Sequence, residues 1–303
     1  MFYLKLALTN IKKNGKIYFP YLITSIFTVM MFYCVKFLGG DNGLRKDSES
    51  AAMMMNLGVY VVIIFSVIFL LYINSFLMKN RKKELGLYNI LGMEKRHVML
   101  IIFFETLIVY LISLGFGVLT GVLFSKLMML ILVKILAIHT SIVFSIDMNA
   151  ILITTLLFSV IFFVSFMINA ASIRFSNPIQ LLKGGQVGEK EPKTKWLMTL
   201  IGVITLGAGY TIALSIEDPI TALVLFFVAV VLVIIGTYAL FTAGSIVILK
   251  ILKKNKKYYY QTNHFISVSQ MMYRMKQNAV GLASICILCT CILVMIYVHV
   301  FLS

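Results

Sequence analysis

Hydrophobic residues gather in seven long stretches that alternate with polar loops. Each stretch is near or above the ~20 residues that an α-helix needs to cross the hydrocarbon core of a bilayer. The pattern therefore predicts an all-α fold, a polytopic membrane bundle of seven transmembrane helices. The expected spans are Tyr18–Leu38, Leu57–Met78, Val98–Ser125, Ile151–Ile173, Trp196–Ile216, Thr221–Ile248 and Ala279–Leu302.

Basic residues concentrate in every other loop, which hold 22 of the 27 Lys and Arg residues. Positive charge in short loops marks the cytoplasmic side of a membrane protein. The sequence therefore predicts a multi-pass protein of the cell membrane with its N-terminus inside and its C-terminus outside. The remaining basic residues are Lys36, Arg45, Lys46, Lys126 and Lys134.

Composition supports this class, because 61% of the residues are apolar and 13% are charged, against about 25% charged in soluble domains. The net charge of +16 could suggest a nucleic-acid partner, but the topology already explains the charge, and no nucleic acid is expected. Membrane lipids are the expected partner, since each basic residue near the anionic leaflet contributes about 1 kcal/mol. Lys253, Lys254, Lys256 and Lys257, followed by Tyr258–Tyr260, resemble such an anchor.

Residues that could carry catalysis or bind a cofactor are not gathered in any recognisable pattern. The spacing Cys286-x-x-Cys289 suits a redox or metal site, but its neighbours are apolar, and ordinary helix packing is the favoured interpretation. The histidines show no metal-ligand spacing, and the chain has no G-x-x-x-x-G-K-[ST] phosphate loop. We therefore expect no cofactor, no metal, no catalytic residue and no ATP site in this chain.

The domain organisation follows the loops. We expect a four-helix block with an N-terminal amphipathic helix over residues 1–183, and a polar cytoplasmic linker over 184–195. A transmembrane hairpin would follow at 196–250, and residues 251–303 would hold a second amphipathic segment and helix seven. Both amphipathic segments are basic and end in Asn shortly before a span. They indicate either an internal repeat, with helix seven opening a second block, or only the basic flank common to inside-to-outside helices.

The richest cytoplasmic segment is Lys79–Arg96. If it is helical, Leu85, Tyr88 and Leu91 recur at three-residue spacing and form an apolar stripe opposite the basic residues. Gly92 is placed to end that helix, because glycine tolerates the left-handed conformation common just past a C-terminus. The segment is either a coupling helix for a partner protein or a basic loop that binds lipid headgroups.

Helix three carries a carboxylate and a glycine motif. Glu105 lies about two turns into the helix, where it can reach the interface or pair with cytoplasmic basic residues, whereas a deep carboxylate would indicate function. We favour packing or pairing. Gly117-x-x-x-Gly121 permits close contact between helices, although the spacing is common in membrane proteins.

Four segments resemble FtsX-like permeases of ABC transporters, in the version carried by the bacitracin-type (Bce-type) branch. The run Arg81-x-x-Glu84-x-Gly86-Leu87-Tyr88-Asn89-Ile90-Leu91-Gly92-Met93 is similar to the family's cytoplasmic signature. The other three are Glu105 followed by Gly115, Gly117 and Gly121; Pro178–Lys183; and Arg274–Ala283.

The resemblance implies a permease subunit that couples ATP hydrolysis by a separate ABC ATPase subunit to a conformational change across the membrane. It also implies resistance to, or sensing of, peptide antibiotics such as bacitracin or lantibiotics that act on lipid-linked cell-wall precursors, and a companion sensor histidine kinase. The expected ATPase-coupling residues are Arg81, Glu84, Leu85, Gly86, Leu87, Tyr88, Asn89, Leu91, Gly92 and Met93, and those expected in helix packing are Glu105, Gly115, Gly117 and Gly121.

The sequence departs from this branch in length. Its members usually have ten membrane helices and an extracellular domain between helices seven and eight, whereas this sequence ends at Ser303, so it resembles an N-terminal part. An FtsX-like signal transmitter or lipoprotein-release permease is therefore an alternative. A secondary transporter is another, although it would predict ionisable groups near the midplane and interrupted helices, and neither is evident.

Overall fold

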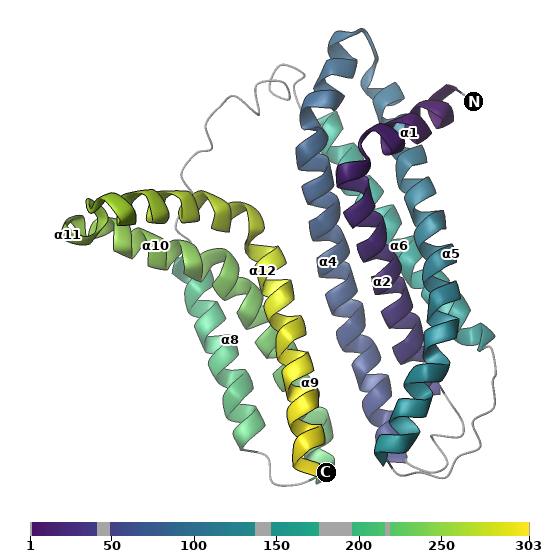
Figure 1. Cartoon of the computed structure of the whole chain (residues 1–303), viewed down its shortest axis with the longest axis vertical. Helices are drawn as coiled ribbons and strands as arrows, with labels where there is room; N and C mark the ends of the chain where they lie inside the picture. The colour runs from purple at the N-terminus through teal and green to yellow at the C-terminus, as the bar shows by residue number, and fades with distance from the viewer. Residues whose placement is uncertain (1, 41–48, 137–146, 176–195, 216–218, 303) are drawn as a thin grey trace. The chain divides into compact units, whose positions relative to one another are not determined.

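The computed structural model describes residues 2–40, 49–136, 147–175, 196–215 and 219–302, and all the regular elements in these ranges are helices (Figure 1). The prediction of an all-α fold is confirmed for this part of the chain. The helices divide into two compact units, Met1–Val187 and Gly188–Ser303.

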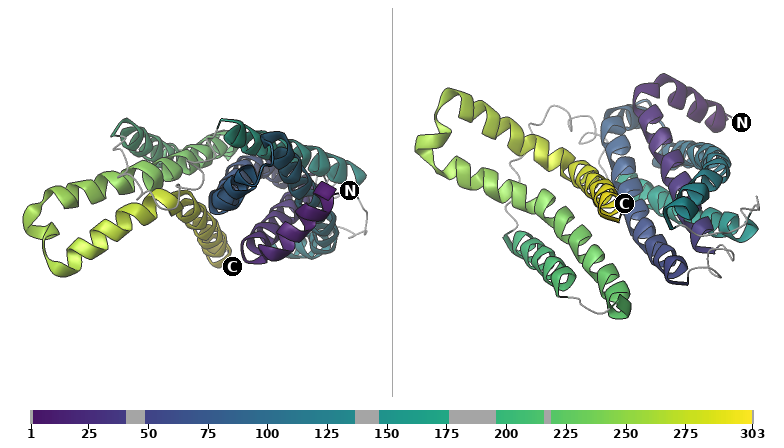
Figure 2. Two further views of the ribbon diagram at one scale, coloured as in Figure 1. Left: turned by 90° about the horizontal axis from the view of Figure 1, so that it is seen from above. Right: turned by 60° about the horizontal axis from the view of Figure 1, so that its bottom comes forward.

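The first unit is a bundle of long helices. Its four longest members run side by side, and the short helix α1 turns away from α2 at one end of the bundle (Figures 1 and 2). Its helices are α1 (Phe2–Lys13), α2 (Gly15–Gly40), α4 (Glu49–Ile90), α5 (Lys95–Leu136) and α6 (Met148–Arg174).

The core of this unit lies between α2, α4, α5 and α6. Phe32 of α2 and Phe158 of α6 are fully buried and meet edge to face, with ring centroids 5.9 Å apart. Such a pair adds about 0.5–1.5 kcal/mol to the stabilisation from burial alone. One cluster of buried apolar side chains draws on all four helices. Large apolar side chains such as Phe116 and Leu156 remain exposed on the outer faces, as a lipid-facing surface requires.

Two glycines let α5 approach α2 closely. A Cβ atom on Gly117 would lie 2.6 Å from the Cβ of Val29, and one on Gly121 would lie 2.9 Å from the ring of Tyr33. The Sγ of Cys34 also lies 3.5 Å from the carbonyl oxygen of Gly121. Small residues at a helix interface allow this close packing of backbones.

The second unit begins with an antiparallel helix pair, α8 (Trp196–Leu214) and α9 (Pro219–Ala239). Glycines again line the contact, since a Cβ atom on Gly209 would lie 2.8 Å from the side chain of Val233. The chain continues from α9 through a π-helical turn into two short helices and one long one. These are η1 (Leu240–Gly244), α10 (Ser245–Lys254), α11 (Lys256–Tyr259) and α12 (Thr262–Leu302).

Six helices of the described residues are long and apolar enough to cross a membrane, and they overlap the first six expected spans. The seventh, Ala279–Leu302, lies within α12, where Asn278–Ile287 is recognised as a shorter apolar helix. The chain is thus a multi-pass membrane protein. Its orientation, the domain limits and the internal repeat stay predictions, and the linker 184–195 and the segment Pro178–Lys183 lie outside the described residues.

Candidate functional site

The signature segment Lys79–Arg96 does not form a separate helix. It continues the membrane helix α4 without a break as far as Ile90, and the turn between α4 and α5 projects past α1 (Figure 1). The helix ends in two bonds, from the Gly92 amide to the Asn89 carbonyl (3.3 Å) and from the Met93 amide to the Tyr88 carbonyl (3.0 Å). This is a Schellman end with Gly92 at φ +91°, so the expected position of the helix end is confirmed.

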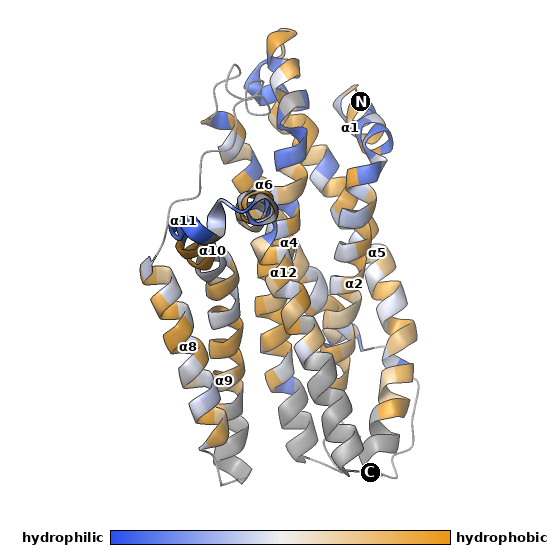
Figure 3. Ribbon diagram, turned by 60° about the vertical axis from the view of Figure 1, so that its left-hand side comes forward, coloured by the Kyte–Doolittle hydropathy of each residue, from blue (hydrophilic) through white to orange (hydrophobic). Residues whose placement is uncertain are grey.

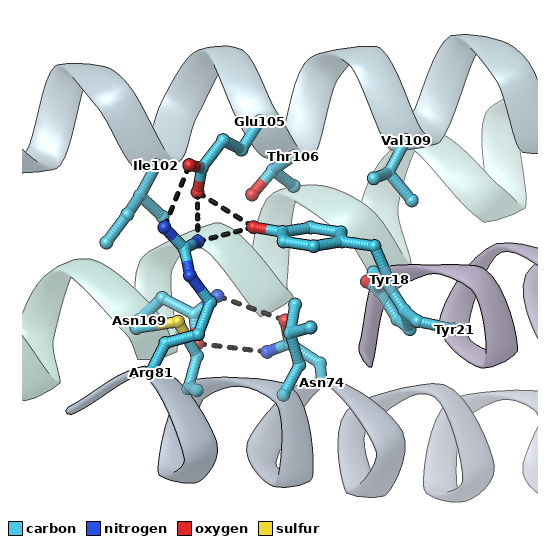
Figure 4. A pocket seen from close by; sticks show the side chains of 11 residues that line it. Tyr18, Tyr21, Asn74, Arg81, Ile102, Glu105, Thr106, Val109 and Asn169 are labelled. Carbon is cyan, nitrogen blue, oxygen red and sulfur yellow. Dashed lines mark hydrogen bonds and ion pairs between the residues drawn. The ribbon is translucent and has the colours of Figure 1, made fainter. Parts of the chain in front are cut away.

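Arg81 lies inside the bundle rather than on the basic surface of the segment. Only 2% of its surface is exposed, and its guanidinium forms a two-pronged ion pair with the carboxylate of Glu105 on α5. Nη2 and Oε1 are 3.0 Å apart, while Nη1 bonds both Oε2 and the hydroxyl of Tyr18. Figure 4 shows these three side chains converging from α4, α5 and α2.

Glu105 has its acceptor positions filled. The Nδ2 of Asn10, on α1, donates to Oε1 over 3.0 Å, and the hydroxyl of Tyr18 donates to Oε2 over 3.0 Å. Together with the two bonds from Arg81, the carboxylate thus accepts hydrogen bonds from three helices. A buried ion pair of this kind is tolerated because every charged atom has a partner.

A second carboxylate, that of Glu84, lies at the solvent-facing edge of this pair. It accepts from Arg81 Nε over 3.2 Å and from Asn14 Nδ2 over 3.0 Å. The hydroxyl of Tyr88 lies 3.2 Å from Glu84 and 3.0 Å from the side-chain oxygen of Asn10. Since that hydroxyl has one proton, it can donate to only one of the two at a time. Burial raises the pKa of the Tyr88 phenol, so Tyr88 remains a donor at neutral pH.

We refer to these side chains together as the Arg81 cluster. It ties the part of α4 that extends beyond the apolar span to α1, α2 and α5, and it holds one guanidinium against two carboxylates. Its members are Asn10, Asn14, Tyr18, Arg81, Glu84, Tyr88 and Glu105.

A small cavity separates the Arg81 cluster from a second buried polar contact, in which Asn74 of α4 and Asn169 of α6 exchange two hydrogen bonds of 3.0 Å (Figure 4). The cavity has room for about one water molecule and has polar groups on its walls. Within the described residues, no group of three or more His, Cys, Asp or Glu side chains could hold a metal ion.

The predicted coupling residues divide into inward and outward groups. Leu85 is 1% exposed and packs with Val98 and Ile102 of α5, and Tyr88 and Met93 pack against the same core. Gly86 is also buried, and the side-chain Nδ2 of Asn89 donates to the Leu85 carbonyl over 3.1 Å. By contrast, Leu87 and Leu91 are 49% and 72% exposed. Their neighbour Ile90, which is not among the predicted coupling residues, is 55% exposed.

The structure therefore differs from the expected stripe of Leu85, Tyr88 and Leu91. Leu91 follows Tyr88 by three residues, but the helix ends at Ile90 and the turn directs Leu91 outward. The expected position of Arg81 is also wrong. The sequence predicts that the basic residues lie opposite the apolar stripe, whereas Arg81 shares the inward face of α4 with Leu85 and Tyr88. We define the exposed group of Leu87, Ile90 and Leu91 as the apolar tip of α4.

The residues expected in helix packing lie in three different environments. Glu105 forms the ion pair with Arg81, and Gly117 and Gly121 lie against α2. A Cβ atom on Gly115 would meet nothing within 4 Å, so no close contact requires glycine there.

Sequence reasoning did not identify Asn10, Tyr18, Asn74 or Asn169 as site residues. The available signal was their polarity inside or beside apolar helices, since polar groups in a membrane interior usually pair with one another. Their partners lie as many as 95 residues away along the chain, so the pairing itself could not be read from local spacing.

Comparison with known proteins gives consistent results. Residues 56–178 match the family described as FtsX-like permease C-terminal. The chain is 28% identical over 279 residues to the uncharacterized ABC transporter permease YvcS of Bacillus subtilis, covering 90% of this chain and 43% of the relative. It is 30% identical over 292 residues to the ABC transporter permease protein YxdM of the same organism, covering 92% of this chain and 44% of the relative.

A bacitracin export permease protein, BceB of Halalkalibacterium halodurans, is 29% identical over 292 residues, which cover 92% of this chain and 45% of the relative. The chain thus spans less than half the length of these curated relatives.

Proposed function

Because the chain contains an FtsX-like permease domain and is related to ABC transporter permeases that include bacitracin export permeases, we propose that it is the permease part of such a transporter. Its substrates would be cell-wall-targeting peptide antibiotics of the bacitracin or lantibiotic type, against which it provides resistance or which it senses. The similarity to BceB of Halalkalibacterium halodurans, a bacitracin export permease protein, supports this substrate class.

Energy would come from a separate ABC ATPase subunit. We expect that partner to bind the cytoplasmic end of the bundle and change its conformation during ATP hydrolysis. The work done would free a lipid-linked cell-wall precursor from the peptide, and a sensor histidine kinase would be the companion that reports the activity.

The observation that carries the coupling role is the continuity of α4. One helix connects the exposed apolar tip to the membrane core, and the Arg81 cluster joins that helix to α1, α2 and α5 just below the tip. A displacement of the tip would therefore move the joined helices together, because breaking the buried ion pair costs about 3–5 kcal/mol.

The ATPase must also discriminate between two states of the bundle. A partner that binds both states equally cannot shift their populations, however tightly it binds. The two acceptors available to the Tyr88 hydroxyl offer one local difference between such states, because a small movement of α1 against α4 would exchange one bond for the other.

The first experiment tests docking at the tip. The variants Leu87→Ser, Ile90→Ser and Leu91→Ser are each co-expressed with the ABC ATPase subunit under test as the partner, and the ATPase that co-purifies with the chain is measured. We expect each to lower recovery several-fold, because hot spots of an interface cost about 2 kcal/mol or more when truncated. Phe2→Ser is the matched control, since Phe2 is also apolar and 68% exposed but belongs to α1. Unchanged recovery for all three tip variants would refute docking at this site.

The second experiment separates coupling from docking. Glu105 and Arg81 are buried beneath the tip, so Glu105→Gln should retain the ATPase but lose its stimulation by bacitracin in proteoliposomes. Loss of association in this variant would show that the cluster shapes the docking surface. Retention of both association and stimulation would show that the ion pair takes no part in coupling.

A further inference from the structure

The second unit contains a helical hairpin that runs transverse to the helices α8 and α9. Figure 1 shows α10 and the first part of α12 running side by side and transverse to α8 and α9, with α11 at the turn. We define residues 245–275 as the basic hairpin. The π-helical turn at Leu240–Gly244 is where the chain bends from α9 into α10, and π-bulges are a recognised cause of sharp kinks.

The lengths of the helices place this bend near the membrane boundary. The 21 residues of α9 extend about 31 Å at 1.5 Å per residue, which matches a hydrocarbon core of about 30 Å. A helix that continues from α9 therefore starts at the boundary of the core. Because α10 turns sideways there, it is directed along the bilayer surface.

The interior of the hairpin is closed by its own apolar side chains. Val268 and Met272 of α12 are 5% and 2% exposed. At the turn, the ring of Tyr259 meets that of Phe265 with centroids 5.1 Å apart, and its hydroxyl lies 3.0 Å from the hydroxyl of Ser269. The hairpin is thus packed on itself, and its other side chains form its outer surface.

That remaining surface is amphipathic. Ile248 and Ile251 of α10 are 60% and 54% exposed, and Ile266 of α12 is 52% exposed. Lysines occupy another side of α10 and the turn, where Figure 3 colours α11 as hydrophilic. The basic residues of the hairpin are Lys250, Lys253, Lys254, Lys256, Lys257 and Arg274.

The segment itself supplies no acidic side chain, because residues 219–303 contain no Asp or Glu. A surface with apolar side chains beside clustered lysines fits the headgroup region of an anionic membrane, where the apolar groups enter the acyl boundary and the lysines bind phosphate. Tyr260, which is 72% exposed, suits the same depth, since tyrosine is enriched at membrane interfaces.

From this placement we propose that the basic hairpin lies in the headgroup region of the bilayer and binds anionic phospholipids through its lysines. The hairpin would anchor the second unit to the anionic leaflet independently of any ATPase or peptide.

The test takes advantage of the single tryptophan of the chain, Trp196. The substitutions Trp196→Phe and Tyr260→Trp are combined, so that tryptophan fluorescence reports only from the hairpin. The chain is reconstituted in nanodiscs of phosphatidylcholine with a minority of phosphatidylglycerol, with bromine atoms on the acyl chains of one lipid or the other. Quenching of the hairpin tryptophan then measures which lipid lies beside the hairpin.

We expect brominated phosphatidylglycerol to quench the hairpin tryptophan at least fivefold more, per mole of lipid, than brominated phosphatidylcholine. A fivefold preference corresponds to about 1 kcal/mol, which is the contribution of one basic residue at an anionic surface. High salt should reduce this preference. Glutamine at four hairpin lysines should abolish it, while the same change at four lysines near the N-terminus should leave it intact. The two sets are Lys253, Lys254, Lys256 and Lys257, and Lys5, Lys12, Lys13 and Lys16.

Equal quenching by the two lipids would overturn the proposal, because the hairpin would then lie at the bilayer without recognising charge. No quenching by either lipid would overturn it as well, since the hairpin would then be directed away from the membrane, as a surface for an acidic protein would be. Because ATPase binding is not measured, failure of this test leaves the docking experiment at the tip of α4 unaffected.

Discussion

Replacing Glu105 by Gln tests how much the buried ion pair with Arg81 contributes to the free energy of unfolding. Glutamine keeps the size of the side chain but removes its charge, and its amide nitrogen must face donors on Arg81 whichever way it is turned. Arg81 is 2% exposed and would keep Glu84 as its carboxylate partner, 3.2 Å from Nε. We expect a loss of about 3–5 kcal/mol in the free energy of unfolding, the usual cost of breaking a buried pair from one side.

The assay is a double-mutant cycle. The unfolding free energies of Arg81→Gln, Glu105→Gln and the double variant are measured by SDS titration of the chain in mixed micelles. The double variant should be more stable than the sum of the single losses predicts, by about 2 kcal/mol or more, because neither charge is then left without its partner. Lys82→Gln is the control, since Lys82 is an exposed neighbour and surface substitutions usually stay within about 0.5 kcal/mol.

Additive losses would refute the reasoning, because they would show that the two side chains act independently. Single losses below about 1 kcal/mol, the range of exposed salt bridges, would refute it too. They would mean that solvent reaches the pair in the membrane-embedded protein.

Three other features give further predictions. Gly117→Ala should lower the free energy of unfolding by about 1–3 kcal/mol through overpacking, because the new Cβ would lie 2.6 Å from a valine of α2. In the control Gly115→Ala the new Cβ meets nothing within 4 Å, so the free energy of unfolding should not change in the same SDS titration. Asn74→Leu should cost about 1–3 kcal/mol by leaving the amide of Asn169 unpaired, and the double leucine variant should recover most of that loss when thermal unfolding is followed by circular dichroism. Burial raises the pKa of the Tyr88 phenol, so the stability that this side chain contributes is complete below pH 10, its ordinary pKa, and is lost as pH rises through the raised pKa. The Tyr88→Phe variant should therefore lose less stability than the parent chain between neutral and alkaline pH. An identical alkaline loss in both proteins would contradict this.

Much of the fold could be predicted from hydropathy alone. The expected span Ile151–Ile173 differs by only a few residues from α6, Met148–Arg174, because a helix that crosses lipid must be apolar over a fixed length. The end of α4 could also be predicted from the sequence, since Gly92 provides the left-handed conformation that the helix end requires. These features depend on residues close together in the chain.

The role of Arg81 could not be predicted from neighbouring residues in this way. Next to Lys82 and Lys83, Arg81 looks like one more cytoplasmic cation, and by composition it belongs to the basic surface. Its burial depends on Glu105, 24 residues away, and on Tyr18, 63 residues away. Charge alone does not distinguish a cation that faces solvent from one that faces a carboxylate on a neighbouring helix.

The sequence by itself determined that this chain is a helical membrane protein, which segments its first six spans overlap, and which family its signature segment resembles, because lipid imposes length and hydrophobicity on each helix separately. Only the tertiary structure decided which face of α4 turns inward, which glycines lie at contacts, and that Arg81 and Glu105 form a buried pair. These outcomes depend on how helices distant in sequence are rotated against one another, and rotation is set by packing between them.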